Sequence, residues 1–151
     1  MPKDLRTIGT GAFYNCAYLR QIEIPDSVYA IGNGAFAECR NLIIVSLPNN
    51  VDYDKINGKT FMNCYRLHLV HLPENNIKQI GYYAFLDTGK NGGLTVTCYN
   101  SDGFIELPNT AVFRDNIDDV KSDVKILVRN AEQVANLKAT SPAWKEMEDC
   151  I

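Results

Sequence analysis

Apolar residues recur along the first two thirds of the chain with a period of about two dozen residues. The phenylalanines of this pattern are 23, 25 and 24 residues apart, at Phe13, Phe36, Phe61 and Phe85. A cysteine lies three residues after each of the first three, at Cys16, Cys39 and Cys64. A period of this length is typical of a solenoid, in which every repeat forms one coil and successive coils stack.

Three copies of the repeat align at nine or more positions. The first copy reads Ile8-Gly9-x-x-Ala12-Phe13-x-x-Cys16-x-x-Leu19-x-x-Ile22-x-Ile24-Pro25-x-x-Val28. The second reads Ile31-Gly32-x-x-Ala35-Phe36-x-x-Cys39-x-x-Leu42-x-x-Val45-x-Leu47-Pro48-x-x-Val51. The third follows a two-residue insertion and reads Ile56-Asn57-x-x-Thr60-Phe61-x-x-Cys64-x-x-Leu67-x-x-Val70-x-Leu72-Pro73. A fourth begins with Ile80-Gly81-x-x-Ala84-Phe85 and has Thr88 at the cysteine position.

The residue types at these positions predict the shape of one coil. Alternating apolar residues before the proline indicate a short strand with one side inward, and the proline ends that strand. The Ile-Gly-x-x-Ala-Phe spacing favours a short helical or 3₁₀ turn. We expect Gly9, Gly32 and Gly81 to permit either a positive φ or a close approach of two backbones. One coil cannot bury its apolar side alone, so we predict a right-handed α/β solenoid with a parallel sheet along one wall.

These strings resemble the BspA-like leucine-rich repeat family, and they cover residues 2–98 almost continuously. The stretch from Ile126 to Trp144 is similar to that family's closing unit, a strand followed by a tryptophan-containing helix. Members of the family are commonly bacterial or protist surface proteins implicated in attachment to host proteins and to other cells. The resemblance therefore implies a secreted or surface-attached parent protein with a signal peptide upstream. An intracellular location is the alternative, because these residues contain no signal peptide and the cysteines are expected to be reduced.

We expect one structural domain in three parts: about four repeat coils over residues 1–98, the first truncated, an irregular insertion over 99–123, and a closing strand with capping helices over 124–151. Asn130 and Gln133 predict a capping box, with Val134 and Leu137 on one face of the helix that follows. Ser141-Pro142 predicts a second helix start, after which Trp144, Met147 and Ile151 form a stripe that covers the last coil.

The N-terminal end shows no such cap, because the chain begins in the middle of a repeat. Pro2-Lys3-Asp4-Leu5 aligns with Pro25-Asp26-Ser27-Val28. An uncapped end exposes apolar core and an unpaired strand edge. We therefore expect this chain to be part of a longer protein, or its open end to be covered by another chain, end-to-end self-association included.

Composition and charge exclude several classes of protein. The chain has 151 residues, of which 46% are apolar and 22% charged, so we expect a folded and not a disordered protein. Its net charge of −3 lacks the basic footprint of a nucleic-acid-binding protein. No apolar run approaches the ~20 residues that a bilayer-spanning helix needs, so we expect no membrane insertion.

The three cysteines that share a repeat position are expected to form an inward-facing ladder. Buried thiols are the favoured interpretation. One disulfide between neighbouring coils is an alternative, because adjacent strands lie about 4.8 Å apart. A metal site is the third, and it is disfavoured because no histidine shares the ladder.

The sequence shows no set of residues that converges on catalysis, and we predict no cofactor and no metal. The pairs Gly9-x-Gly11 and Gly32-x-Gly34 do not continue as a phosphate-binding loop. His68 and His71 have no recurrent nucleophile beside them. Four aspartates of the region 99–123 do not match a calcium loop and are expected to be solvated, with an adventitious cation site as the alternative, at Asp115, Asp118, Asp119 and Asp123. A hydrolase or transferase would need a deep pocket with converging carboxylates.

The outward side of the sheet wall is the candidate binding site. Residues that flank the inward position of each strand point away from the core, and they are Gln21, Glu23, Ile44, Ser46, Leu69 and His71, with Thr95 and Leu127 extending the two columns. Ile44 and Leu69 are expected to form a small exposed apolar spot. We predict a non-enzymatic recognition or adhesion module that binds protein partners through this wall. A structural spacer with no ligand is the alternative, and residues 99–123 could instead form a specialised binding loop.

Overall fold

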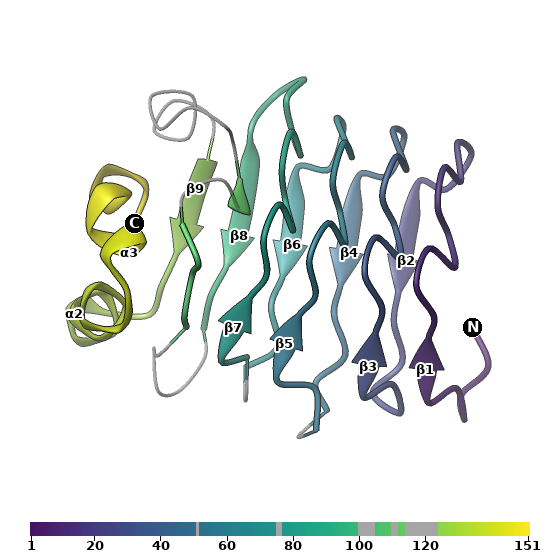
Figure 1. Ribbon diagram of the computed structural model, residues 1–151, viewed down its shortest axis with the longest axis horizontal. Helices are drawn as coiled ribbons and strands as arrows, with labels where there is room; N and C mark the ends of the chain where they lie inside the picture. Colours follow the sequence, from purple (N-terminus) through teal and green to yellow (C-terminus); the bar gives the residue numbers. More distant parts are fainter. Residues whose placement is uncertain (51, 75–76, 100–104, 110–111, 114–123) are drawn as a thin grey trace.

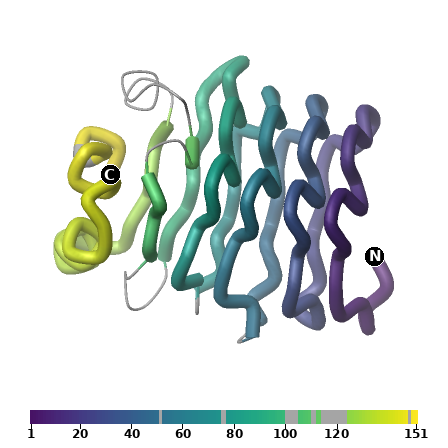
Figure 2. Tube along the Cα trace, in the orientation of Figure 1, coloured from purple at the N-terminus to yellow at the C-terminus, as the bar shows by residue number. Residues whose placement is uncertain are grey.

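The computed structural model describes residues 1–50, 52–74, 77–99, 105–109, 112–113 and 124–151. The chain winds into a solenoid of stacked coils, with the helices gathered at its C-terminal end (Figures 1 and 2). A five-stranded sheet runs along one wall, with all neighbouring strands parallel. Its strands, in spatial order, are β2 (Gln21–Glu23), β4 (Ile44–Ser46), β6 (Leu69–His71), β8 (Leu94–Thr97) and β9 (Val124–Leu127). The predicted solenoid with a parallel wall is confirmed.

A second set of very short strands lies across the coils from this sheet. These strands are β1 (Thr7–Ile8), β3 (Ala30–Ile31), β5 (Lys55–Ile56) and β7 (Gln79–Ile80), and they pair in parallel as β1–β3 and β5–β7. Each ends on the isoleucine for which the sequence predicted the start of a helical turn. The isoleucine is therefore in a strand, and the turns begin only after it.

The segments after these strands are consecutive tight turns and not 3₁₀ helices, which corrects the sequence-based prediction. In the first coil Gly11 and Asn15 have φ values of 62° and 57°. Positive φ recurs at the same two positions of the next three coils, at Gly34, Glu38, Lys59, Asn63, Tyr83 and Asp87. A left-handed residue every four positions interrupts a right-handed helix, which is why the apolar spacing alone was misleading.

Backbone hydrogen bonds join the turns of neighbouring coils, and those donated by the phenylalanines all run in one direction. The N–H groups of Phe13, Phe36 and Phe61 donate to carbonyls of the following coil at 2.7, 2.9 and 2.8 Å, the acceptors being Ala35, Thr60 and Ala84. Stacking the coils buries these backbone N–H and C=O groups away from water. Each buried group then needs a partner, and the backbone of the neighbouring coil supplies it. The turns thus depend on the stack as much as the sheet does.

At Gly32 and Gly81 the repeated glycine is explained by a close approach of two backbones and not by a positive φ, whereas a Cβ atom on Gly9 would meet nothing within 4 Å. A Cβ atom on Gly32 would lie 2.4 Å from the Thr10 nitrogen, while Gly32 N–H donates to the Ile8 carbonyl at 2.8 Å. In the third coil Asn57 occupies this position, and its side-chain amide donates to the Ile31 carbonyl at 2.6 Å. The asparagine side chain therefore makes the contact that a glycine N–H makes elsewhere, which accounts for the departure of the third copy.

The core of the solenoid is built around a continuous pile of phenylalanine rings. Ring centroids of Phe13, Phe36, Phe61 and Phe85 are 5.0, 5.5 and 5.5 Å apart, with interplanar angles of 6°, 7° and 9°. A fifth ring, Phe113, stacks on Phe85 at 5.6 Å. The rings of the second, third and fourth coils have no exposed area.

Two described segments of the predicted insertion, 105–109 and 112–113, are hydrogen-bonded to the fourth coil. Glu106 N–H donates to the Lys78 carbonyl at 2.8 Å, and the Glu106 carbonyl accepts from Ile80 N–H at 3.0 Å. Asp87 N–H likewise donates to the Phe113 carbonyl at 3.1 Å. Residues 105–109 and 112–113 thus lie against the fourth coil as parts of a fifth. The four aspartates discussed above lie outside the described residues.

The C-terminus closes the solenoid with α2 (Ala131–Thr140), α3 (Pro142–Glu146) and the 3₁₀ helix η2 (Glu148–Cys150). Asn130 caps α2 as predicted, because its Oδ1 accepts from Gln133 N–H at 2.9 Å. The Gln133 side chain returns to Arg129 N–H at 2.7 Å, one residue earlier than a capping box requires. It also donates to the Cys98 carbonyl at 2.7 Å, so Gln133 and not Val134 is the buried residue beside Leu137.

The second helix start is only partly as predicted. Pro142 is the first residue of α3, but the Ser141 side chain makes no capping hydrogen bond. Trp144 and Met147 are buried, and the Trp144 indole N–H donates to the Ile105 carbonyl at 2.5 Å. Ile151 is half-buried. Trp144 is therefore a capping core residue that ties the helices to the last coil.

Replacing Phe36 by alanine should destabilise the protein by about 3–5 kcal/mol, because it leaves a cavity between the rings of Phe13 and Phe61. Glu23→Ala is the matched control on the outward side, where we expect a change within about 0.5 kcal/mol. Urea denaturation of the two variants measures both effects. Equal losses of stability would show that the inward and outward positions are wrongly assigned.

Candidate functional site

The strand register places the predicted binding residues in two vertical columns on the outer face of the sheet. The first column is Gln21, Ile44, Leu69, Thr95 and Lys125, and the second is Glu23, Ser46, His71, Thr97 and Leu127. The inward column between them is Ile22, Val45, Val70, Val96 and Ile126. Side chains alternate between the two faces of a strand, so every predicted residue falls in the column expected for it, Thr95 and Leu127 included.

The apolar spot on this wall differs from the prediction. Ile44 is 39% exposed, but Leu69 is half-buried because it lies between Ile44 and Thr95 in the middle of the sheet. Leu127, on the last strand, is 44% exposed. The exposed aliphatic side chains therefore stand apart on a mainly polar wall.

The wall is shallow, with grooves along its edge. One of about 320 Å³ is lined by Gln21, Ile22, Glu23, Ile44 and Ser46. Another of about 440 Å³ lies beside β2 and is lined by Met1, Lys3, Gln21, Ile22, Glu23 and Pro25. Surfaces of this shape suit contact with another macromolecule better than enclosure of a small molecule.

A third groove of about 290 Å³ lies where the central strands end, and it contains His71. The His71 Nδ1 atom lies 3.1 Å from Thr97 Oγ1 on the neighbouring strand, which fixes the imidazole ring. Tyr99 also lines the groove, and the guanidinium of Arg129 lies 6.0 Å from the centre of its ring. Sequence reasoning missed Tyr99 and Arg129, because neither belongs to a repeated position.

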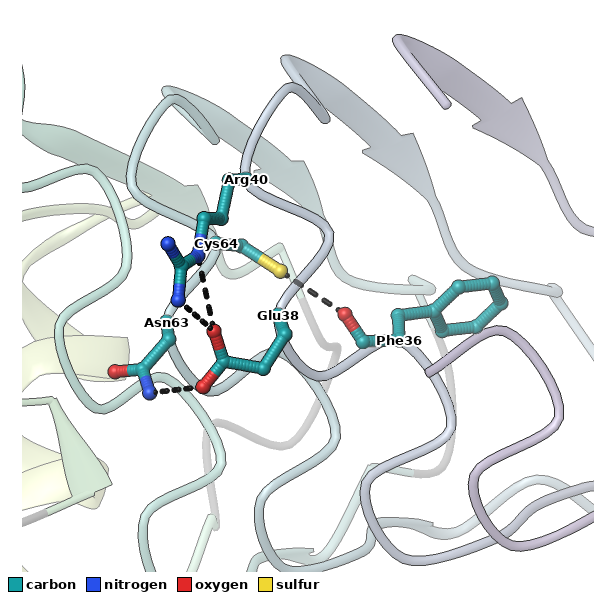
Figure 3. Close-up of polar contacts among 5 residues, drawn as sticks. All are labelled: Phe36, Glu38, Arg40, Asn63 and Cys64. Atoms are coloured by element: carbon teal, nitrogen blue, oxygen red, sulfur yellow. Dashed lines mark hydrogen bonds and ion pairs between the residues drawn. The ribbon is translucent and has the colours of Figure 1, made fainter. Parts of the chain in front are cut away.

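The cysteine position is a hydrogen-bonding position. Cys39 Sγ donates to the Phe13 carbonyl at 3.0 Å and Cys64 Sγ to the Phe36 carbonyl at 3.1 Å, as Figure 3 shows for Cys64. Thr88 Oγ1 makes the same bond to the Phe61 carbonyl at 2.7 Å. The position therefore requires a small side chain that can donate to the preceding coil, which explains why threonine replaces cysteine in the fourth copy.

Burial makes the inner thiols unreactive. It raises the pKa of Cys39 to about 11 and raises the pKa of the Cys64 thiol further. Both cysteines are thiols, as is Cys16, and no disulfide joins them. Cys16 is half-buried, because no described coil precedes it. The thiolate is the reactive form, so neither Cys39 nor Cys64 is suited to nucleophilic or metal chemistry at neutral pH.

The other polar candidates have structural contacts. His68 Nδ1 lies 3.2 Å from the Gly93 carbonyl, and a Cβ atom on Gly92 would meet the His68 ring at 2.9 Å. Across the residues that the structure describes, no three His, Cys, Asp or Glu side chains gather as a metal site would require. No helix within the described ranges is long and apolar enough to cross a membrane.

Comparison with known families supports the assignment of the repeat. A sequence model described as the BspA type leucine rich repeat region matches residues 1–102, in six copies. The chain belongs to this family. Leucine-rich repeats of this type are typical of surface proteins and commonly bind other proteins. None of the curated proteins compared with the chain matches it.

Two solved structures share the fold. A leucine-rich repeat protein of T. pallidum is 33% identical, with a TM-score of 0.53, over 58% of this chain and 39% of that protein. A leucine-rich repeat protein from Bacteroides ovatus ATCC 8483 is 27% identical, with a TM-score of 0.63, over 82% of this chain and 29% of that protein. The chain therefore spans well under half the length of either structure.

The differing burial of the cysteines predicts which of them react with a thiol reagent. At pH about 8, Cys16 should be modified in the native protein, whereas Cys39 and Cys64 should react only after denaturation, since they are buried and protonated. Mass spectrometry of peptides from protein alkylated before and after addition of urea measures this. Rapid modification of Cys39 in the native state would contradict the hydrogen-bonded ladder.

Proposed function

We propose that this chain is a non-enzymatic recognition module that binds a protein partner through the outer face of the five-stranded sheet. The observation that carries the proposal is the pair of outward columns, from Gln21 to Thr95 and from Glu23 to His71, on a wall held in register by its strands. Solenoid proteins use extended surfaces of this kind to bind macromolecules. The wall needs no cofactor and no metal for that role.

The wall has the features of a modest protein-binding surface. Ile44 supplies an exposed apolar contact, and polar side chains that can form hydrogen bonds surround it, among them Gln21, Glu23 and Ser46. Such an arrangement of an apolar contact within a polar rim is common in interfaces between proteins. The rigid backbone lowers the entropy lost on binding.

We further propose an adhesive role at the surface of a bacterial cell, or in a secreted protein. The support is family membership and likeness to leucine-rich repeat proteins of T. pallidum and Bacteroides ovatus. The parent protein, its location and its partners are part of this proposal.

A spacer function is the second candidate, and the first coil favours it. Phe13, Cys16, Leu19 and Ile22 are half-buried there, whereas their counterparts in the second coil, Phe36, Cys39, Leu42 and Val45, have no exposed area. Another coil or another copy of the chain stacked on this face would complete their burial. An array extended in this way would separate domains without a ligand of its own.

Ile44→Asp should abolish or strongly weaken attachment to a protein partner, because it puts a charge at the centre of the proposed contact. Binding to a panel of purified host serum and extracellular-matrix proteins is measured by surface plasmon resonance. Tyr82→Asp is the matched control, since Tyr82 is 58% exposed and lies on the turns, away from the sheet. If the Ile44→Asp variant still binds its partner as well as the unsubstituted chain does, the wall is excluded as the binding surface. If no protein of the panel binds the unsubstituted chain, the spacer function is favoured.

A further inference from the structure

The segments in which each coil passes from its turns into the five-stranded sheet form the upper edge in Figure 1, and in the first three coils they contain arginines and tyrosines. The residues are Tyr14, Tyr18, Arg40, Tyr65 and Arg66, and we refer to them as the Arg–Tyr edge. They come from the first three coils and belong to neither outward column of the wall. The repeat does not require them, because none occupies a core position.

Contacts between neighbouring coils hold Arg40, Tyr65 and Arg66 along this edge. The guanidinium carbon of Arg40 lies 5.5 Å from the centre of the Tyr65 ring in the next coil. Arg66 Nη1 donates to Asn41 Oδ1 at 3.3 Å, and Asn41 in turn donates to the Ala17 carbonyl at 2.8 Å. The edge is thus continuous over three coils.

Arg40 is fixed before any partner arrives. Its Nε and Nη2 atoms donate to Glu38 Oε2 at 3.1 and 2.9 Å, and Asn63 Nδ2 donates to the other carboxylate oxygen at 2.6 Å (Figure 3). The hydrogen bond from Asn63 and those from Arg40 lower the pKa of Glu38, so it remains ionised. The Arg40 side chain is nevertheless 60% exposed, whereas that of Glu38 is 15% exposed. A guanidinium oriented in this way loses less entropy on binding than a free one.

The charge of this side of the molecule is opposite to that of the whole chain. Residues 9–20, 32–43 and 57–68 contain one acidic residue, Glu38, and four basic ones, Arg20, Arg40, Lys59 and Arg66, which is a formal charge of +3. The complete chain has a net charge of −3. Electrostatic complementarity therefore favours an acidic partner at this edge.

The tyrosines favour a protein over a polyanion. Tyr18 is 98% exposed and Tyr14 60% exposed, and Tyr18 comes one residue after Ala17, whose carbonyl accepts from Asn41. Exposed tyrosine and arginine are the residues that most often dominate the affinity of protein interfaces, because they give large contacts at low entropic cost. A sulfated glycan has few apolar groups to pack on these rings, whereas the side chains of a protein segment supply them.

We propose that the Arg–Tyr edge binds an acidic, extended segment of a partner protein. Carboxylates of the segment pair with Arg40 and Arg66, and its apolar groups pack on Tyr14 and Tyr18. This surface is separate from the sheet wall, so the chain has two faces on which partners can be held at once.

Fluorescence anisotropy with a fluorescein-labelled peptide that alternates Glu and Tyr tests the proposal, with a Gln-Tyr peptide as the neutral probe. We expect the acidic peptide to bind, the neutral one to bind at least about tenfold more weakly, and added NaCl to weaken the acidic complex. Arg40→Gln with Arg66→Gln should weaken binding about tenfold or more, and Tyr18→Ala about fivefold.

The chain offers a matched control for each change. Arg6 and Tyr29 are exposed at the opposite edge of the coils, where Tyr29 N–H donates to the Arg6 carbonyl at 3.0 Å, and Tyr29 is 46% exposed. Arg6→Gln and Tyr29→Ala should leave binding unchanged. Ile44→Asp should also leave it unchanged, which separates this surface from the wall.

Four results would overturn the proposal: no binding of the acidic peptide, equal binding of the neutral one, binding unaffected by the double arginine substitution, or tighter binding of heparin than of the peptide. Circular dichroism of each variant checks that the fold is retained. These side chains are exposed or half-buried, so the variants should fold.

Discussion

The backbone contact between neighbouring coils is the constraint on which the rest of the structure depends. On one wall, N–H groups of the phenylalanine turns donate to carbonyls of the following coil. On the other wall, parallel strand pairing joins the coils. The phenylalanine rings stack between these two walls, at a spacing close to that of the strands. Because these contacts repeat with one register, a residue at a given position has similar surroundings in each of the inner coils. That is why Thr88 makes the bond that Cys39 and Cys64 make. The residue types that recur in this chain therefore follow from a packing requirement.

The sequence predicts the regular part of this structure well, because its signals are periodic. Strand positions, the inward phenylalanines, the cap at Asn130 and the two outward columns all follow from spacing. It predicts local turn geometry poorly, since the Ile-Gly-x-x-Ala-Phe spacing fits a helix and only the positive φ at residues such as Asn15 and Glu38 shows otherwise. The fifth coil was missed because Phe113 lacks the glycine and cysteine signals that mark earlier copies. Leu69 is less exposed than expected. The alternation of side chains along a strand shows which way Leu69 points, but not how much of it the neighbouring strands cover.

The two candidate surfaces differ in how they arise. The wall is a consequence of the fold, and the residues of its outward columns differ from coil to coil. The Arg–Tyr edge instead combines particular residues from three coils, held by Glu38, Asn41 and Asn63. The packing of the coils does not require these residues, yet side-chain contacts hold them in place. Such positions on a repeat scaffold are good candidates for binding a partner. Periodicity alone does not reveal such an edge.

The most direct measurement of the central claim, that equivalent positions lie one above another on the wall, is disulfide formation between introduced cysteines. Glu23 and Ser46 are partners on adjacent strands, whereas Glu23 and His71 are separated by the strand between them. Parallel neighbours lie about 4.8 Å apart, within the range of a disulfide, and second neighbours lie beyond it. Under mild oxidation, Glu23→Cys with Ser46→Cys should form a cross-link and Glu23→Cys with His71→Cys should not. A cross-link in the second pair and none in the first would contradict the account.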